Sequence, residues 1–193
     1  MGTIYDDLVS QLEGVGSKNE AILALRAGGE DAKPALLRGM HHPSYRVRYG
    51  CLLVLDHTII DEPTRLAVLR ALDDPHRKVR RAALHVLDCE VCKPEGYCGI
   101  EGVDLEAVYL EKARHDPSQR VRRSAMGHFM WRSALDDHIS DAMREVLAVE
   151  ESDEVRKRAA MVLAFPAVAS VPRGVDRQAS FSAKVQKLLS GDA

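Results

Sequence analysis

The strongest constraint on the fold is a short phrase that returns four times along the chain. In three copies a histidine or aspartate and a proline precede a valine–arginine pair, at residues 42–51, 74–87 and 116–125. A fourth copy at 150–160 keeps the valine–arginine pair but lacks the proline. Copies that recur every 20–50 residues or so are typical of stacked supersecondary units. The sequence therefore predicts an array of such units.

Each phrase predicts the start of a helix. Asp74 and Asp116 can accept hydrogen bonds from the free N–H groups at a helix N-terminus. Pro75 and Pro117 would then occupy the first helical position, where the missing N–H costs nothing. The apolar residues that follow each valine have helical spacing. We therefore expect each phrase to form the second helix of a two-helix unit.

Two further positions of the phrase have a predicted role in packing. A small residue four positions after each valine would let a neighbouring helix approach closely; these residues are Cys51, Ala83, Ala125 and Ala159. The arginine after each valine is expected to pair with an acidic cap residue of the same or an adjacent unit, forming a ladder. The ladder arginines are Arg48, Arg80, Arg122 and Arg156.

These phrases resemble HEAT repeats, and most closely the short HEAT-like repeats named after phycobilisome lyases. The resemblance rests on residues 29–37, on His42-Pro43 and on Val47-Arg48, and it extends over residues 29–165. His42 stands where the family usually has aspartate. The resemblance implies an α-helical scaffold, although a few family members are enzymes, including bilin lyases.

The predicted fold is all-α, a right-handed α–α superhelix (solenoid) of about four HEAT-like hairpins with helical caps at both ends. A single domain, 1–193, is divided into an N-terminal cap (1–29), four repeats (30–60, 61–89, 103–135, 137–165), an insertion loop (90–102) and a C-terminal cap (166–193). Helices are expected at 4–13, 19–27, 31–41, 44–58, 63–73, 76–89, 103–115, 118–134, 138–149, 152–164 and 181–189.

Bulk properties limit the classes of partner. The 193 residues carry a formal net charge of −2, which argues against indiscriminate binding to nucleic acid or membranes. No apolar run approaches the length of about 18 residues that a membrane span needs. The N-terminus lacks a signal-peptide pattern, so a cytoplasmic protein with reduced thiols is expected. The oligomeric state has no signature in the sequence.

The insertion between the second and third repeats carries the candidate metal chemistry. Cys89 and Cys92 form a C-x-x-C pair, and Cys98 follows in a loop rich in proline and glycine. Such spacing presents thiolates to one zinc ion. The fourth ligand would be His85, four residues before Cys89 on one helical face, or His57, which occupies the position equivalent to Cys89 in the preceding repeat. We predict a structural Cys₃His zinc site.

Other states of these cysteines remain open. Free thiols or a disulfide would also fit the spacing, whereas an iron–sulfur cluster is disfavoured because Cys51 belongs to the repeat core. A structural zinc would not make the protein an enzyme. The chain has no His-Glu dipeptide, which disfavours a di-iron hydroxylase, and it has no Ser/His/Asp set or phosphate-binding loop.

Basic residues concentrate in the second helices and predict a binding face. The candidate partner-binding residues are Arg46, Arg48, Lys78, Arg81, Arg120, Arg123, Lys157 and Trp131. The predicted function is a non-catalytic scaffold that binds a partner protein or peptide on a concave face. One alternative is a nucleic-acid binder that uses this basic row. The other is a lyase or metal-dependent enzyme.

Overall fold

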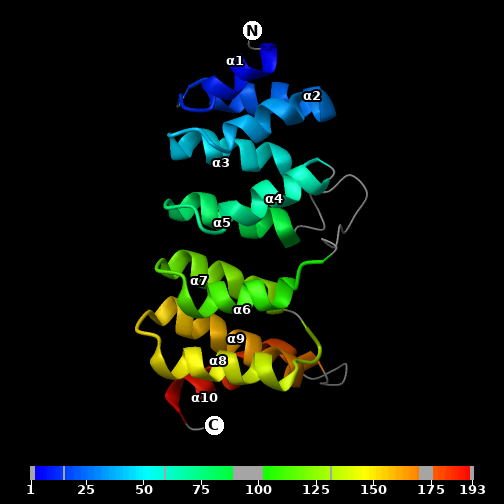
Figure 1. Ribbon diagram of the computed structural model, residues 1–193. Helices are drawn as coiled ribbons and strands as arrows, with labels where there is room; N and C mark the ends of the chain where they lie inside the picture. Colours follow the sequence, from blue (N-terminus) through cyan, green and yellow to red (C-terminus); the bar gives the residue numbers. More distant parts are fainter. Residues whose placement is uncertain are drawn as a thin grey trace. The chain divides into compact units, whose positions relative to one another are not determined.

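The computed structural model describes residues 3–14, 16–58, 60–88, 102–130, 132–169 and 176–191, and these residues contain helices and no strands (Figure 1). They form two compact units, Met1–Leu105 and Glu106–Ala193, each described here by itself. The predicted all-α solenoid class is confirmed. No described helix is both long enough and apolar enough to cross a membrane.

The described part of the first unit contains the helices α1 (Ile4–Gln11), α2 (Lys18–Gly39), α3 (Tyr45–Leu55), α4 (Glu62–Ala71) and α5 (Arg77–Asp88). Helix α2 packs against α1 and α3, and α5 packs against α3 and α4. Figure 1 shows these helices as successive layers of one stack. This is the hairpin-on-hairpin arrangement predicted from the repeated phrase.

The second unit contains α6 (Leu105–His115), α7 (Gln119–Ala125), the 3₁₀ helix η1 (Met126–Phe129), α8 (Asp137–Val149), α9 (Asp153–Ala169) and α10 (Arg177–Ser190). Helix α9 lies against α7, α8 and α10. Ala160, Ala164 and Val185 form a buried cluster where α9 meets α10, and Leu188 and Leu189 pack against it.

The repeated valines have equivalent environments. Val47, Val79, Val121 and Val155 are all fully buried, each in the first turns of a second helix. The small residues four positions later are also fully buried, at Cys51, Ala83, Ala125 and Ala159. The predicted burial of both positions in the core is therefore confirmed.

The structure corrects the predicted helix starts. Helices α5 and α7 begin at Arg77 and Gln119, so Pro75 and Pro117 precede the helices instead of occupying the first helical position. Asp74 Oδ1 accepts from the backbone N–H of His76 at 2.8 Å, and Asp116 Oδ1 accepts from that of Ser118 at 2.8 Å. Each aspartate therefore closes the turn before the helix and does not cap its first turn.

Three helix boundaries also differ from the prediction. The second helix of the third repeat ends at Ala125 and continues as η1. Helix α9 runs through Pro166 to Ala169, and the Phe165 ring packs edge-on against the Phe181 ring of α10. Helix α10 begins at Arg177, since Asp176 caps it by accepting from the Ala179 N–H at 3.0 Å.

Helix α2 is two helices joined without a loop. Gly29 has φ 52° and ψ −128°, a backbone conformation that a residue with a Cβ rarely adopts. The predicted break at Gly28-Gly29 is therefore present as a kink. The first half of α2 belongs to the N-terminal cap, and the second half is the first helix of repeat one.

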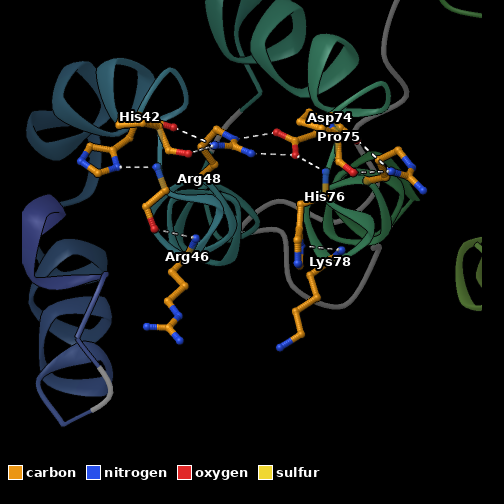
Figure 2. Close-up of polar contacts among 10 residues, drawn as sticks. His42, Arg46, Arg48, Asp74, Pro75, His76 and Lys78 are labelled. Carbon is orange, nitrogen blue, oxygen red and sulfur yellow. Dashed lines mark hydrogen bonds and ion pairs between the residues drawn. The ribbon is translucent and has the colours of Figure 1, made fainter.

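The predicted arginine ladder is confirmed between consecutive repeats within each unit. Arg48 forms a bidentate pair with Asp74, with Nε to Oδ2 at 2.6 Å and Nη2 to Oδ1 at 2.9 Å (Figure 2). Arg122 pairs in the same way with Glu150, at 2.7 Å for each bond. The hydrogen bond from Arg122 lowers the pKa of Glu150, although burial acts against it. Bidentate pairs fix direction as well as distance.

The same guanidinium also anchors its own repeat. Arg48 Nη1 donates to the carbonyls of His42 and Pro43, each at 2.8 Å. Arg80 Nη1 donates to the carbonyls of Asp74 and Pro75, at 2.8 and 3.2 Å. Each arginine therefore holds the turn of its own repeat, and Arg48 connects that turn to the following one.

Gly39→Ala is expected to destabilise the first unit. An added Cβ would lie 2.6 Å from Cys51 Sγ and 2.7 Å from Val9 Cγ1, so the buried neighbours would have to move. Overpacking of this kind costs about 1–3 kcal/mol of unfolding free energy, measurable by urea denaturation. Gly16→Ala is the control, because no atom lies within 4 Å of its added Cβ. Equal stability of both variants would contradict the close packing of α2 on α3.

Arg48→Gln is expected to lower the unfolding free energy by about 3 kcal/mol, because it leaves Asp74 buried without its charge partner. Arg46→Gln is the matched control on the same helix. Its side chain is exposed, so we expect a change of less than about 0.5 kcal/mol. Denaturant unfolding of both variants measures the difference, and a neutral Arg48→Gln would remove the ladder as a source of stability.

Candidate functional site

A cavity of about 260 Å³ in the first unit gathers three cations. Lys18 comes from the start of α2, Arg46 from α3 and Lys78 from α5. Tyr45, Tyr49 and the turn that follows α1 complete the lining. We call this site the basic pocket. Figure 2 shows the Arg46 and Lys78 side chains extending from neighbouring helices to the same side, away from the Arg48–Asp74 pair.

Helix geometry explains why the pocket and the ladder lie on different sides. Successive residues are about 100° apart around a helix, so the residues before and after a buried valine are about 200° apart. The residue after Val47 is the ladder arginine Arg48, and the residue before it is Arg46. Lys78 precedes Val79 in the same way. One phrase therefore supplies both a structural cation and a surface cation.

Aromatic rings position the cations of the basic pocket. The Tyr45 ring stacks on the His76 ring, with centroids 3.5 Å apart and planes inclined by 13°. Lys78 Nζ lies 6.0 Å from the Tyr45 centroid, and Lys18 Nζ lies 4.5 Å from the Tyr49 centroid. Cation–π attraction holds an ammonium group over a ring without neutralising its charge. The cations therefore remain available to an anion.

Cations outnumber carboxylates in the lining of the pocket, where Glu13 is the acidic residue. Within the described residues, none of Lys18, Arg46 and Lys78 forms an ion pair with a carboxylate. Burial, followed by repulsion from Lys78, lowers the pKa of Lys18. A hydrogen bond from Arg46 is the main cause of the lowered pKa of Tyr45, and the nearby cations act in the same direction. A bound anion would relieve this repulsion.

The remaining candidate binding residues do not join the pocket. Arg48 is held in the ladder, with its side chain only 12% exposed. Arg123 Nη1 pairs with Glu154 Oε2 at 2.6 Å. Arg81, Arg120 and Lys157 are exposed. Trp131 lies outside the described residues. Of the predicted set, the pocket therefore brings together Arg46 and Lys78.

The sequence prediction missed Lys18, Tyr45 and Tyr49. The two tyrosines flank Val47 within the repeated phrase, so their proximity to Arg46 was a readable signal. Lys18 had no such signal. It belongs to the N-terminal cap, and its position depends on how α2 folds back against α3.

The zinc prediction falls mainly on residues outside the described part of the chain, because Cys89, Cys92 and Cys98 all lie there. The two candidate histidines are described. His85 Nε2 lies 3.2 Å from the buried Asp56 Oδ2, which brings the ends of α3 and α5 side by side. His57 follows Asp56 and is half-buried. Neither histidine is identified as the fourth ligand by these contacts.

A second cluster that could hold a metal was not predicted from the sequence. Glu106, Asp136 and His138 place their ligand atoms within 4.8 Å of one another. Glu106 Oε1 is 2.6 Å from His138 Nε2, and its Oε2 accepts from Arg132 at 2.8 Å. Because the guanidinium already holds this carboxylate and would repel a metal ion, we interpret the cluster as an ion-pair network.

Comparison with known proteins agrees with the solenoid. Residues 17–88 match the family model described as HEAT repeats. No protein of curated function matches the chain. Among solved structures, a designed armadillo repeat protein in complex with the peptide (KR)4 is similar over 98% of this chain and 91% of its own, with 13% identity and a TM-score of 0.51.

A second designed armadillo repeat protein is similar over 96% of this chain and 98% of its own, with 14% identity and a TM-score of 0.48. The closer likeness to phycobilisome-lyase repeats stays a prediction, because the matching family model describes HEAT repeats in general. The stacked hairpins, the buried valines and the family match together identify residues 17–88 as HEAT repeats.

Proposed function

We propose that this protein is a non-catalytic scaffold that binds an acidic peptide segment of a partner protein at the basic pocket. The observation that carries the proposal is the convergence of Lys18, Arg46 and Lys78 on one cavity, without carboxylate partners in the described residues. The other predicted cations serve the ladder, pair with acids or lie elsewhere on the surface. Carboxylates on a peptide would complete charge-assisted hydrogen bonds with these three groups.

The composition of the pocket supports a peptide ligand. Tyrosine and arginine are enriched among the residues that dominate protein interfaces, because they combine apolar area with hydrogen bonding. The solved armadillo repeat protein of similar fold holds the basic peptide (KR)4. The pocket here is lined by three cations and by one carboxylate, Glu13, so an acidic peptide is the ligand of complementary charge.

Fluorescence anisotropy with labelled peptides tests the proposal. We expect the acidic peptide (DE)4 to bind the full chain more tightly than (KR)4 or the neutral (NQ)4. Arg46→Gln and Lys78→Gln should each weaken (DE)4 binding about tenfold, the loss of one charge-assisted bond. Arg77→Gln is the matched control, because Arg77 is exposed at the start of α5 but does not line the pocket.

Two outcomes would contradict the proposal. The first is equal binding of (DE)4 and (KR)4. The second is tighter binding of a single-stranded oligo(dT) than of (DE)4, with a steep dependence on salt, which would favour the nucleic-acid alternative. Unchanged (DE)4 affinity in both pocket variants would place the binding surface elsewhere.

We also propose that the loop carrying Cys89, Cys92 and Cys98 binds a structural zinc ion, with His85 or His57 as the fourth ligand. The contact between His85 and Asp56 supports this proposal, since a carboxylate commonly orients a histidine ligand through its second ring nitrogen. The zinc would stiffen the insertion and would leave the protein non-catalytic.

The zinc proposal predicts one equivalent of zinc in the purified chain and a fall in melting temperature on chelation. Cys51 gives a built-in control, because burial raises the pKa of its thiol to about 12. Thiol titration of the native protein should therefore report on the loop cysteines. Full reactivity of those thiols in metal-free protein whose stability is unaffected by chelator would exclude the site.

A further inference from the structure

The second unit has a cavity that is unrelated to the basic pocket. It lies among α8, α9 and α10, with a volume of about 630 Å³, within the size range of small-molecule sites. Leu147, Leu188 and Leu189 line it together with the cations Arg144, Arg156 and Lys184. We call it the leucine cavity. Among the residues that the structure describes, no acidic side chain lines it.

Arg156 is the ladder arginine of the last repeat, and its partner is different. In the earlier repeats, Arg48 and Arg122 direct both arms of the guanidinium at a carboxylate of the following repeat. Arg156 follows the buried Val155 in the same way, and its Nε donates to the Leu147 carbonyl at 3.3 Å.

The carboxylate paired with Arg156 is a weak substitute for a following repeat. Asp153 lies 3.8 Å from Arg156 Nη1, and its side chain is 98% exposed. An exposed pair of this kind contributes little. The guanidinium also lines the leucine cavity, and within the described residues no carboxylate of a following repeat pairs with it. An incoming ligand carboxylate could take that place.

The other two cations of the cavity are similarly available. Arg144 pairs with Asp141 at 2.7 Å, but both side chains are largely exposed. Lys184 forms no ion pair within the described ranges. The half-buried leucines give the cavity an apolar side, and they pack against the buried cluster where α9 meets α10. The cavity thus combines cations with apolar surface.

From this geometry we propose that the leucine cavity binds a medium-chain carboxylate, an anionic head group on an unbranched alkyl chain. The carboxylate takes the place of the next repeat's acid at Arg156, and the chain lies against the leucines. Such a ligand brings no polar group beyond its head, so none is left buried without a partner. A peptide would bring amide groups that need partners of their own.

A second copy of this chain is a poorer occupant. Stacking by its first repeat would offer His42 at the position equivalent to Asp74. His42 Nδ1 accepts from the Ser44 N–H at 3.1 Å, as Asp74 Oδ1 accepts from the His76 N–H, but an imidazole gives the arginine no carboxylate. End-to-end stacking therefore leaves Arg156 without a bidentate partner.

Titration of the ¹⁵N-labelled full chain with decanoate, below its micelle concentration, tests the proposal by amide shift changes and calorimetry. We expect shifts confined to α8, α9 and α10. Decanol and decylammonium, with the same chain but without the negative charge, should bind about tenfold more weakly or not at all.

Two lysines on α10 provide matched variants. Lys184→Gln should weaken decanoate binding about tenfold, whereas Lys187→Gln, on the same helix but outside the cavity, should leave it unchanged. Arg46→Gln should also leave it unchanged, which separates this site from the basic pocket. Lys184→Gln removes an ion from the surface of α10 without disturbing the ladder, so the test does not depend on Arg156 variants folding.

Several results would overturn the proposal. These are the absence of shifts in α8, α9 and α10, equal binding of decylammonium, loss of decanoate binding in Arg46→Gln, and tighter binding of the peptide acetyl-Leu-Asp-Leu-amide than of decanoate. The last result would assign the cavity to an acidic peptide.

Discussion

The bidentate pairing of an arginine in one repeat with a carboxylate in the next connects the layers of each unit. Leucine, valine and alanine side chains pack helix on helix, but apolar contacts are less directional than hydrogen bonds. The guanidinium of Arg48 adds directional bonds, because it donates to two carbonyls of its own turn and to both carboxylate oxygens of Asp74. Apolar packing thus stabilises the stack of helices, and the bidentate pair fixes how one repeat is aligned with the next.

The ladder uses the arginine that follows each buried valine, so the cations that precede Val47 and Val79 take no part in it. Arg46 and Lys78 sit on the opposite side of the buried valines from the ladder, so the repeat that aligns the layers also aligns them on one surface. In the fourth repeat the equivalent residue is Glu154, which pairs with Arg123. The sign of the charge at one position of the phrase therefore decides whether a repeat contributes to a cationic surface.

The repeated phrase predicted the features that depend on local sequence. Valine burial, the small residues beside it, the ladder and the break at Gly29 all follow from spacing and residue size. The position of Pro75 outside its helix did not follow, because an aspartate before a proline can close a turn as readily as it caps a helix. Lys18 in the basic pocket was also missed, since its position depends on contacts between α1, α2 and α3 that have no periodic signature.

The backbone conformation of Gly29 affects where Lys18 lies in the basic pocket. It joins the cap to the first repeat without a loop, so its two backbone angles set the direction in which the first half of α2 leaves the second half. Lys18 begins that first half, whereas Arg46 belongs to the next layer. The spacing between these two charges therefore depends on the Gly29 backbone as well as on the packing of α1, α2 and α3. A change in the direction of this helix would therefore alter the spacing of the pocket cations while the residues that line the pocket stay the same.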